Sequence, residues 1–196
     1  YPTKTESSTM PEAREPARRA FLMDPGYSQL SFSSAIEPLR MPNQLSDRTL
    51  YETLLVSLDG RPVSASNQVR TAVDAAAGSE PPVDLVIVCG GVDIEQQSSR
   101  ELLGWLRRLA RRHTALGAVC TGGFLLAQAG VMEGYRCTLH WEHISGIYET
   151  LQFPGTVFAS ELFVLDRDRY TSSGGVAPLD MMLNLITRQQ GIELAE

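Results

Sequence analysis

Leu116-Gly-Ala-Val-Cys-Thr-Gly-Gly-Phe124 is the stretch that decides the fold. Residues 116–119 are small or apolar, which suits a strand buried on both faces. Cys120 follows at once, and after two glycines the run from Phe124 to Ala129 has the composition of a helix. A thiol at a sharp turn from strand to helix is the geometry of a nucleophile elbow, and the N–H groups of the helix N-terminus then favour the thiolate. The alternative is that Cys120 is a small buried hydrophobic residue at a strand end.

The composition predicts one cytoplasmic globular domain. The chain has 196 residues, a net charge of −6 and 43% hydrophobic residues, which is enough for a sizeable core. The net negative charge argues against binding of nucleic acid by this chain alone, because contacts to phosphates require clustered Lys and Arg. Three cysteines, at positions 89, 120 and 137, form no disulfide framework and indicate a reducing compartment. No apolar run approaches the ~20 residues of a membrane span, and the polar N-terminus has no signal-peptide core.

Strands alternate with helices along most of the chain. Residues 1–19 contain three prolines and no hydrophobic periodicity, so we expect a flexible leader there and one domain over residues 20–196. Strands are predicted at residues 20–23, 51–58, 83–89, 116–119, 157–165 and 169–172, two short ones within 63–73 and one near 135–140; helices are predicted at residues 28–40, 98–112, 124–129, 142–151 and 176–190. Pro38 and Pro42 should kink or end the first helix. This alternation predicts an α/β fold, a mostly parallel sheet with helices on both faces.

Several strand ends are expected to meet at one pocket. Ligands bind at the carboxyl ends of strands in parallel sheets. Gly90-Gly91, Cys120 and Ser173-Gly-Gly175 each follow a predicted strand. The backbone N–H groups of Gly91 and Thr121 are candidates for an oxyanion hole, or equally for holding the carboxylate of a bound ligand.

His140 is the histidine that best fits a partner for Cys120. His113 ends an amphipathic helix and His143 is expected on a half-exposed helix, whereas His140 ends a short strand soon after the elbow. The alternative for His140 is a structural role. Trp141 follows it, and its ring either stacks on a cationic ligand or packs in the core.

A metal site is not predicted, nor is any cofactor. Cys137, His140, Glu142 and His143 supply ligand types within seven residues. A structural zinc site brings two ligand pairs from separate segments, and no second pair is visible.

Four stretches taken together resemble a known family. Residues 117–124, Gly134-Tyr-Arg-Cys-Thr-Leu-His-Trp141, and Thr171-Ser-Ser-Gly-Gly-Val176 with Leu179-Asp180 resemble the PfpI-like branch of the class I glutamine amidotransferase-like superfamily. Ser34-Ala-Ile-Glu-Pro-Leu-Arg40 with Asn43 is similar to a signature of the amino-terminal sensor domains of AraC-type transcriptional regulators. The regulators with this signature include ones that answer to amino acids and quaternary amines. The resemblance covers about residues 20–190.

The resemblance implies a flavodoxin-like three-layer α/β sandwich that forms a homodimer and senses a small-molecule effector. It implies a non-catalytic ligand-binding and dimerisation domain, which reaches DNA only through a C-terminal pair of helix-turn-helix motifs absent from this chain. Residues 188–196 lie where the linker to those motifs would start, as in a truncated sensor module. An amino-acid-like or quaternary-amine effector would contact Cys120, Thr121, His140, Trp141, Gly91 and, on the first helix, Ser31 and Glu37.

The alternative is a cysteine-dependent enzyme of the same branch, such as an amidase or an isonitrile hydratase, with Cys120 and His140 as its reactive pair. Many enzymes of the superfamily have His after the cysteine; here Thr121 stands there, as it does in isonitrile hydratases. The acid that faces the cysteine in those enzymes falls at Ser31, and serine cannot act as that carboxylate. Glu37, six residues later, points to a different side of the helix unless Pro38 kinks it. A third hypothesis is a redox sensor in which the thiol of the elbow is oxidised.

Overall fold

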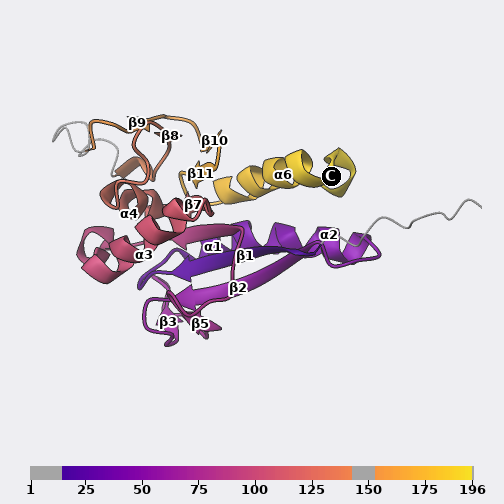
Figure 1. Ribbon diagram of the computed structural model, residues 1–196, viewed down its shortest axis with the longest axis horizontal. Helices are drawn as coiled ribbons and strands as arrows, with labels where there is room; N and C mark the ends of the chain where they lie inside the picture. The colour runs from indigo at the N-terminus through magenta and orange to yellow at the C-terminus, as the bar shows by residue number, and fades with distance from the viewer. Residues whose placement is uncertain (1–14, 143–152, 196) are drawn as a thin grey trace, which may run out of the picture.

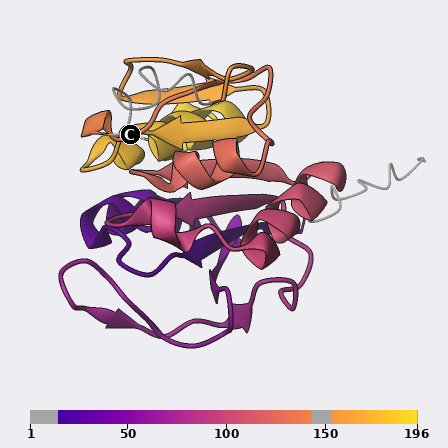
Figure 2. The same cartoon turned by 90° about the vertical axis from the view of Figure 1, so that its left-hand side faces the viewer.

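A seven-stranded sheet forms the centre of the protein in the computed structural model, which describes residues 15–142 and 153–195 (Figure 1). The strand order is β10-β11-β7-β6-β1-β2-β5, and every neighbouring pair is parallel except the hairpin of β10 and β11. In Figure 2 the orange and yellow C-terminal segments form one side of the molecule, and the purple segment with β3 to β5 forms the other. The strands of this sheet are β1 (Ala17–Met23), β2 (Tyr51–Ser57), β5 (Ala75–Ala76), β6 (Leu85–Cys89), β7 (Ala115–Val119), β10 (Phe163–Asp166) and β11 (Arg169–Ser172).

Helices cover both faces of the sheet, as predicted, and each face has its own apolar core. On one face α3 (Arg100–Arg111) and α4 (Gly122–Gln128) pack over a cluster that includes Trp105, Leu125 and, from β6, Val86 and Val88. On the other face α1 (Gln29–Ile36) and α6 (Ala177–Gln190) pack against each other and over Phe21 and Ile87. The three-layer α/β sandwich is therefore confirmed.

The remaining elements are short. Two small sheets stand apart from the central one: β3 (Val63–Ser64) with β4 (Arg70–Thr71), and β8 (Arg136–Cys137) with β9 (Val157–Phe158). The 3₁₀ turns are η1 (Glu37–Leu39), η2 (Ile94–Gln97) and η3 (Ile192–Leu194), and α2 (Arg40–Leu45) follows η1 directly. Within the two described ranges, no helix has both the length and the apolar character needed to cross a membrane.

The first helix is interrupted near its two prolines, as the sequence predicted. Ser28 caps α1 by accepting a hydrogen bond from the backbone N–H of Ser31, and α1 ends at Ile36. Pro38 then lies in the 3₁₀ turn η1. Pro42 lies in the first turn of α2, where a missing N–H costs no helical hydrogen bond.

The start of the sheet corrects the predicted leader. β1 begins at Ala17, so residues 17–19 belong to the central sheet and the prediction of a leader is wrong for them. Arg18 fits into a strand here because polar partners receive it. The Arg18 guanidinium lies 3.0 Å from Glu52 on β2, and the Arg18 backbone N–H donates to Asp84 at 2.7 Å.

One predicted strand is divided, and two predictions fall outside the described residues. The segment 157–165 forms β9 and β10, which belong to different sheets, because β9 pairs with β8 whereas β10 pairs with β11. Residues 1–14 of the predicted leader lie outside the described residues. So do residues 143–152, which hold His143 and nearly all of the helix predicted at 142–151.

Candidate functional site

The carboxyl ends of four adjacent strands meet at one edge of the sheet. The register pairs Met23 of β1 with Cys89 of β6, Cys89 with Val119 of β7, and Val119 with Ser172 of β11. The residues that follow these strands therefore lie side by side: Asp24, Gly90, Cys120 and Ser173. The sequence predicted this convergence for the last three.

The turn after β7 is a strained elbow that only small neighbours allow. Cys120 has a φ of 58°, in the left-handed region, which costs a non-glycine residue about 1–3 kcal/mol. A Cβ on Gly90 would collide with the backbone nitrogen of Gly122, and a Cβ on Gly122 would collide with the carbonyl oxygen of Val88. The two loops thus touch through bare backbone, and the elbow predicted from the sequence is confirmed.

The Cys120 thiol is more buried and less acidic than its place in the sequence predicts. The residue is 9% exposed but belongs to neither apolar core cluster. Burial raises the pKa of the Cys120 thiol, the N–H of Thr121 and the hydroxyl of Ser31 lower it, and the charge of Glu142 adds to the rise. The expectation of a thiolate is therefore wrong. Helix α4 has seven residues, and the desolvation of the sulfur outweighs what its N-terminus contributes.

Ser31 stands beside the sulfur on the side of α1. Its side chain is fully buried, and its hydroxyl makes no hydrogen bond to the described residues other than its interaction with the thiol. A hydroxyl can donate to a thiolate, but it cannot serve as a carboxylate acid or base. Glu37 does not take over that role. It pairs with Arg40 at 2.7 Å on the surface, and its side chain is 63% exposed.

His140 lies beside Cys120, as predicted. Its backbone N–H donates to the Cys120 carbonyl at 3.2 Å. A Cβ built on Gly174 would lie 3.3 Å from both the Cys120 sulfur and Cδ2 of His140, so the two side chains border the same small space. Nδ1 of His140 lies 3.5 Å from a carboxylate oxygen of Glu142 and makes no hydrogen bond to the described residues.

Trp141 is a surface residue. Its side chain is 70% exposed, and its ring lies 5.6 Å from the His140 ring at a tilt of 35°. The alternative that Trp141 packs in the core is therefore wrong, and contact of its ring with a ligand stays a prediction.

Thr121 and Gly91 are linked by a hydrogen bond. The Thr121 hydroxyl donates to the Gly91 carbonyl at 2.7 Å, and Thr121 is 4% exposed. Gly91 forms an isolated antiparallel bridge with Tyr27, and a Cβ on Gly91 would collide with the carbonyl of Gly26. An oxyanion hole formed by the backbone N–H groups of Gly91 and Thr121 stays a prediction. In this structure the Thr121 N–H faces the Cys120 sulfur.

Asp24 is a buried carboxyl group that sequence reasoning missed. It is 4% exposed, burial raises its pKa to about 8, and its Oδ2 has no hydrogen-bond partner within the described part of the chain. The charges of Asp24 and Cys120 both raise the pKa of the Cys89 thiol, so Cys89 lies close to each of them. Asp24-Pro-Gly26 has the composition of a turn, and nothing local in it signals burial.

The site brings together a protonated thiol, a buried hydroxyl and a partly exposed imidazole, and the neutral carboxyl group of Asp24 lies nearby, beside Cys89. Such an arrangement can hydrogen-bond a small polar ligand, but among residues 15–142 and 153–195 no carboxylate hydrogen-bonds to the sulfur. Across residues 15–142 and 153–195, no three potential metal ligands gather at one place.

Comparisons with known proteins agree with this geometry. The DJ-1/PfpI family model matches residues 18–188. The chain is 48% identical over 185 residues to the HTH-type transcriptional regulator GbdR of Pseudomonas aeruginosa, covering 94% of this chain and 50% of that protein. It is 41% identical over 175 residues to the HTH-type transcriptional regulator CdhR of the same species, covering 89% and 51%. The chain thus spans about half the length of the curated relatives it matches.

A solved structure gives the same assignment. The crystal structure of an AraC family transcriptional regulator from Pseudomonas putida superposes with a TM-score of 0.82 at 30% identity. The match covers 92% of this chain and 96% of that one. The chain belongs to the DJ-1/PfpI family, in the branch found in AraC-family transcriptional regulators.

Proposed function

We propose that the chain is the effector-sensing domain of an AraC-type transcriptional regulator, and that it does no chemistry of its own. The observation that carries the proposal is the surroundings of Cys120. The sulfur has the Ser31 hydroxyl beside it where enzymes of this fold place an acid, and burial raises the pKa of the thiol. The relatives named as HTH-type regulators support it, since the helix-turn-helix motifs of such a protein would lie outside the half that this chain matches.

The effector that fits best is a small metabolite with a quaternary ammonium or other cationic group. The exposed face of Trp141 can attract such a cation. The Glu142 carboxylate, 61% exposed and 3.5 Å from His140, adds negative charge at the same mouth. Deeper in, the backbone around Gly91 and Thr121 offers polar contacts to the other end of the molecule.

Binding would act on DNA through a change in population. An effector that prefers one conformation of the domain, or one arrangement of a homodimer, shifts the equilibrium by its difference in affinity. Gly174, which borders Cys120 and His140, leads directly into α6, so the first turn of α6 is the element that an effector would displace. The three free cysteines fit a reducing cytoplasm, where such a regulator works.

Thermal unfolding with a panel of amino acids and betaines tests the proposal. An effector at a hundredfold excess over its Kd adds about 2.7 kcal/mol. In a chain of this size each kcal/mol raises the Tm by about 2–4 °C. Trp141→Ala should reduce the shift, whereas Leu162→Ala, which removes another exposed apolar side chain, should leave it unchanged. If no compound shifts the Tm while small acyl or carbonyl substrates are turned over, the proposal is wrong.

A cysteine-dependent hydrolase or hydratase is the second candidate, and the strained backbone at Cys120 favours it. Proteins keep a residue at a φ of 58° where the strain serves a site. This candidate requires turnover of some amide, nitrile-like or aldehyde substrate that Cys120→Ser abolishes. Equal turnover by the wild type and the serine variant would exclude it.

A further inference from the structure

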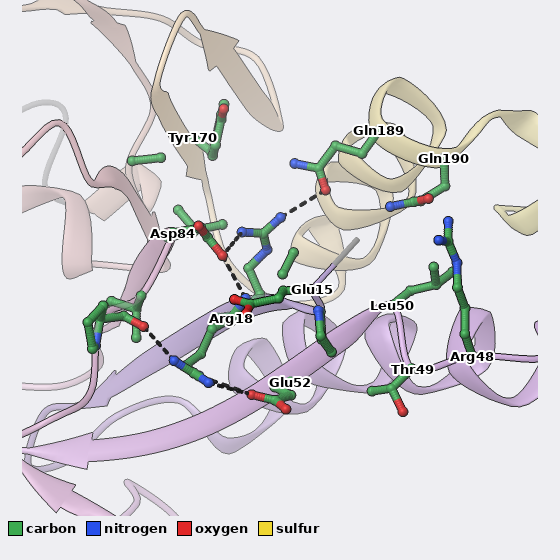
Figure 3. A pocket seen from close by; sticks show the side chains of 17 residues that line it. Glu15, Arg18, Arg48, Thr49, Leu50, Glu52, Asp84, Tyr170, Gln189 and Gln190 are labelled. Atoms are coloured by element: carbon green, nitrogen blue, oxygen red, sulfur yellow. Dashed lines mark hydrogen bonds and ion pairs between the residues drawn. The ribbon is translucent and has the colours of Figure 1, made fainter. Parts of the chain in front are cut away.

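A groove of about 940 Å³ lies at the amino-terminal ends of the parallel strands, at the edge of the sheet opposite Cys120 (Figure 3). The beginnings of β1, β2 and β6 and the last turn of α6 form its walls. In Figure 3, Gln189 and Gln190 project from α6, with Arg48 and Leu50 facing them from the segment before β2. This groove is separate from the elbow and shares no residue with it.

Arg19 is a buried cation in this groove whose hydrogen-bonding capacity is mostly unused. Its side chain is 5% exposed. Nη2 donates to Oε1 of Gln189 at 3.0 Å, Nη1 lies 3.9 Å from Oδ2 of Asp84, and Nε has no hydrogen-bond partner within the described residues. A guanidinium has five N–H donors, and 3.9 Å is too long for a hydrogen bond.

The charge of Arg19 is only partly compensated. Asp84, its ion-pair partner, is 64% exposed and already accepts a hydrogen bond from the Arg18 backbone. Burial lowers the pKa of the Arg19 guanidinium, and the nearby Tyr51 and Asp84 only partly offset that effect. A buried charge with so little pairing is costly, and an anion in the groove would relieve the cost.

The rest of the lining limits which anion fits. Arg18 is already neutralised by Glu52 at 3.0 Å. Arg48 is exposed on the rim and makes no ion pair with the described residues, so it is the second available cation. Glu15, Glu52 and Asp84 also line the groove, and they would repel an anion that carries two charges on one group. A planar, singly charged carboxylate suits a guanidinium and meets this limit.

We propose that this groove binds the carboxylate of a small organic acid, with Arg19 as the buried partner and Arg48 as the partner on the rim. The amide groups of Gln189 and Gln190 complete the polar wall on the side of α6. This second site does not depend on the function proposed for the elbow, because it lies at the other end of the strands.

Side-chain NMR of the intact chain tests this site. Acetate is titrated at constant ionic strength against chloride, while the ¹H–¹⁵N signal of Arg19 Nε and the backbone amides of Gln189 and Gln190 are followed. We expect a saturable shift of these signals with acetate and none with chloride. Arg48→Gln should raise the Kd about tenfold through loss of a charge-assisted hydrogen bond. Arg100→Gln, an exposed arginine at the start of α3, is the matched control and should leave the Kd unchanged.

Three results would overturn the proposal: a shift that chloride reproduces, tighter binding of inorganic phosphate than of acetate, or an unchanged Kd in Arg48→Gln. Arg19→Gln should abolish the saturable shift of the amides of Gln189 and Gln190. If this buried substitution prevents folding, the exposed Arg48 variant decides the question, because its side chain makes no ion pair on which the described fold relies.

Discussion

Replacement of Asp24 by Asn should remove most of the dependence of stability on pH between about 4 and 8. Burial raises the pKa of Asp24 from 3.8 to about 8, so over this interval the folded state holds a proton that the unfolded state releases. Its contribution to stability is fully present below the unfolded pKa and is lost as the pH rises through the folded pKa. The interval between 3.8 and about 8, at ~1.36 kcal/mol for each pH unit, sets an upper limit of about 6 kcal/mol on this contribution.

Urea unfolding at a series of pH values measures this effect. The wild type should become steadily less stable from about pH 4 to pH 8. Asp24→Asn should be similar to the wild type in mild acid and more stable by several kcal/mol above pH 8, because its amide is neutral throughout. Asp59→Asn is the control: Asp59 forms an exposed pair with Arg61, so this variant should keep the wild-type slope. Parallel pH profiles for the wild type and Asp24→Asn would falsify the assignment of a neutral buried carboxyl group.

Two further substitutions test the elbow. Ser31→Ala should raise the pKa of the Cys120 thiol further, because the thiolate loses one hydrogen bond. Alkylation of Cys120 by iodoacetamide at neutral pH should slow by about tenfold, the effect of one hydrogen bond to a charged group. An unchanged rate, read by mass spectrometry of the Cys120 peptide, would show that the hydroxyl does not interact with the sulfur. Gly90→Ala should cost about 3 kcal/mol or more, because its Cβ would meet the backbone of the elbow loop. Gly104→Ala, in the middle of α3 with space around it, should instead stabilise by about 0.5–1 kcal/mol, and equal Tm shifts for the two glycine variants would contradict the close contact of the loops.

The elbow could be predicted because its determinants are local. A buried strand, a thiol, and glycines follow one another within nine residues, and the turn needs nothing beyond them except a second glycine loop at Gly90. The break in the first helix was equally readable, since proline acts on its own turn. The juxtaposition of His140 and Cys120 was predicted from the position of His140 at the end of a short strand soon after the elbow, in contrast to the other two histidines.

The protonation states at the site could not be predicted, because they depend on segments far away in the sequence. The thiolate expected at Cys120 rested on the adjacent helix N-terminus, whereas the desolvation that reverses it comes from the packing of other segments around the elbow. Asp24 looked like part of a surface turn, and its burial arises from tertiary packing that no neighbouring residue reveals.

The groove was missed for the same physical reason. Its lining comes from six separate segments, around residues 15–19, 48–52, 82–85, 115, 170 and 189–190, and none of them carries a motif. Arg19 falls at the end of the predicted leader, because residues 1–19 contain three prolines and show no hydrophobic periodicity. Only the sheet register shows that its side chain is buried.

Helix α6 connects the two ends of the sheet. Gly174, just before its start, borders Cys120 and His140, and Gln189 near its end accepts a hydrogen bond from Arg19. A helix of 14 residues spans about 21 Å, and we expect it to move as one element. An effector that displaces the first turn of α6 would therefore also move Gln189 relative to Arg19, and a carboxylate held in the groove would resist that movement. Since coupling between two binding sites is reciprocal, each ligand must change the affinity for the other by the same factor.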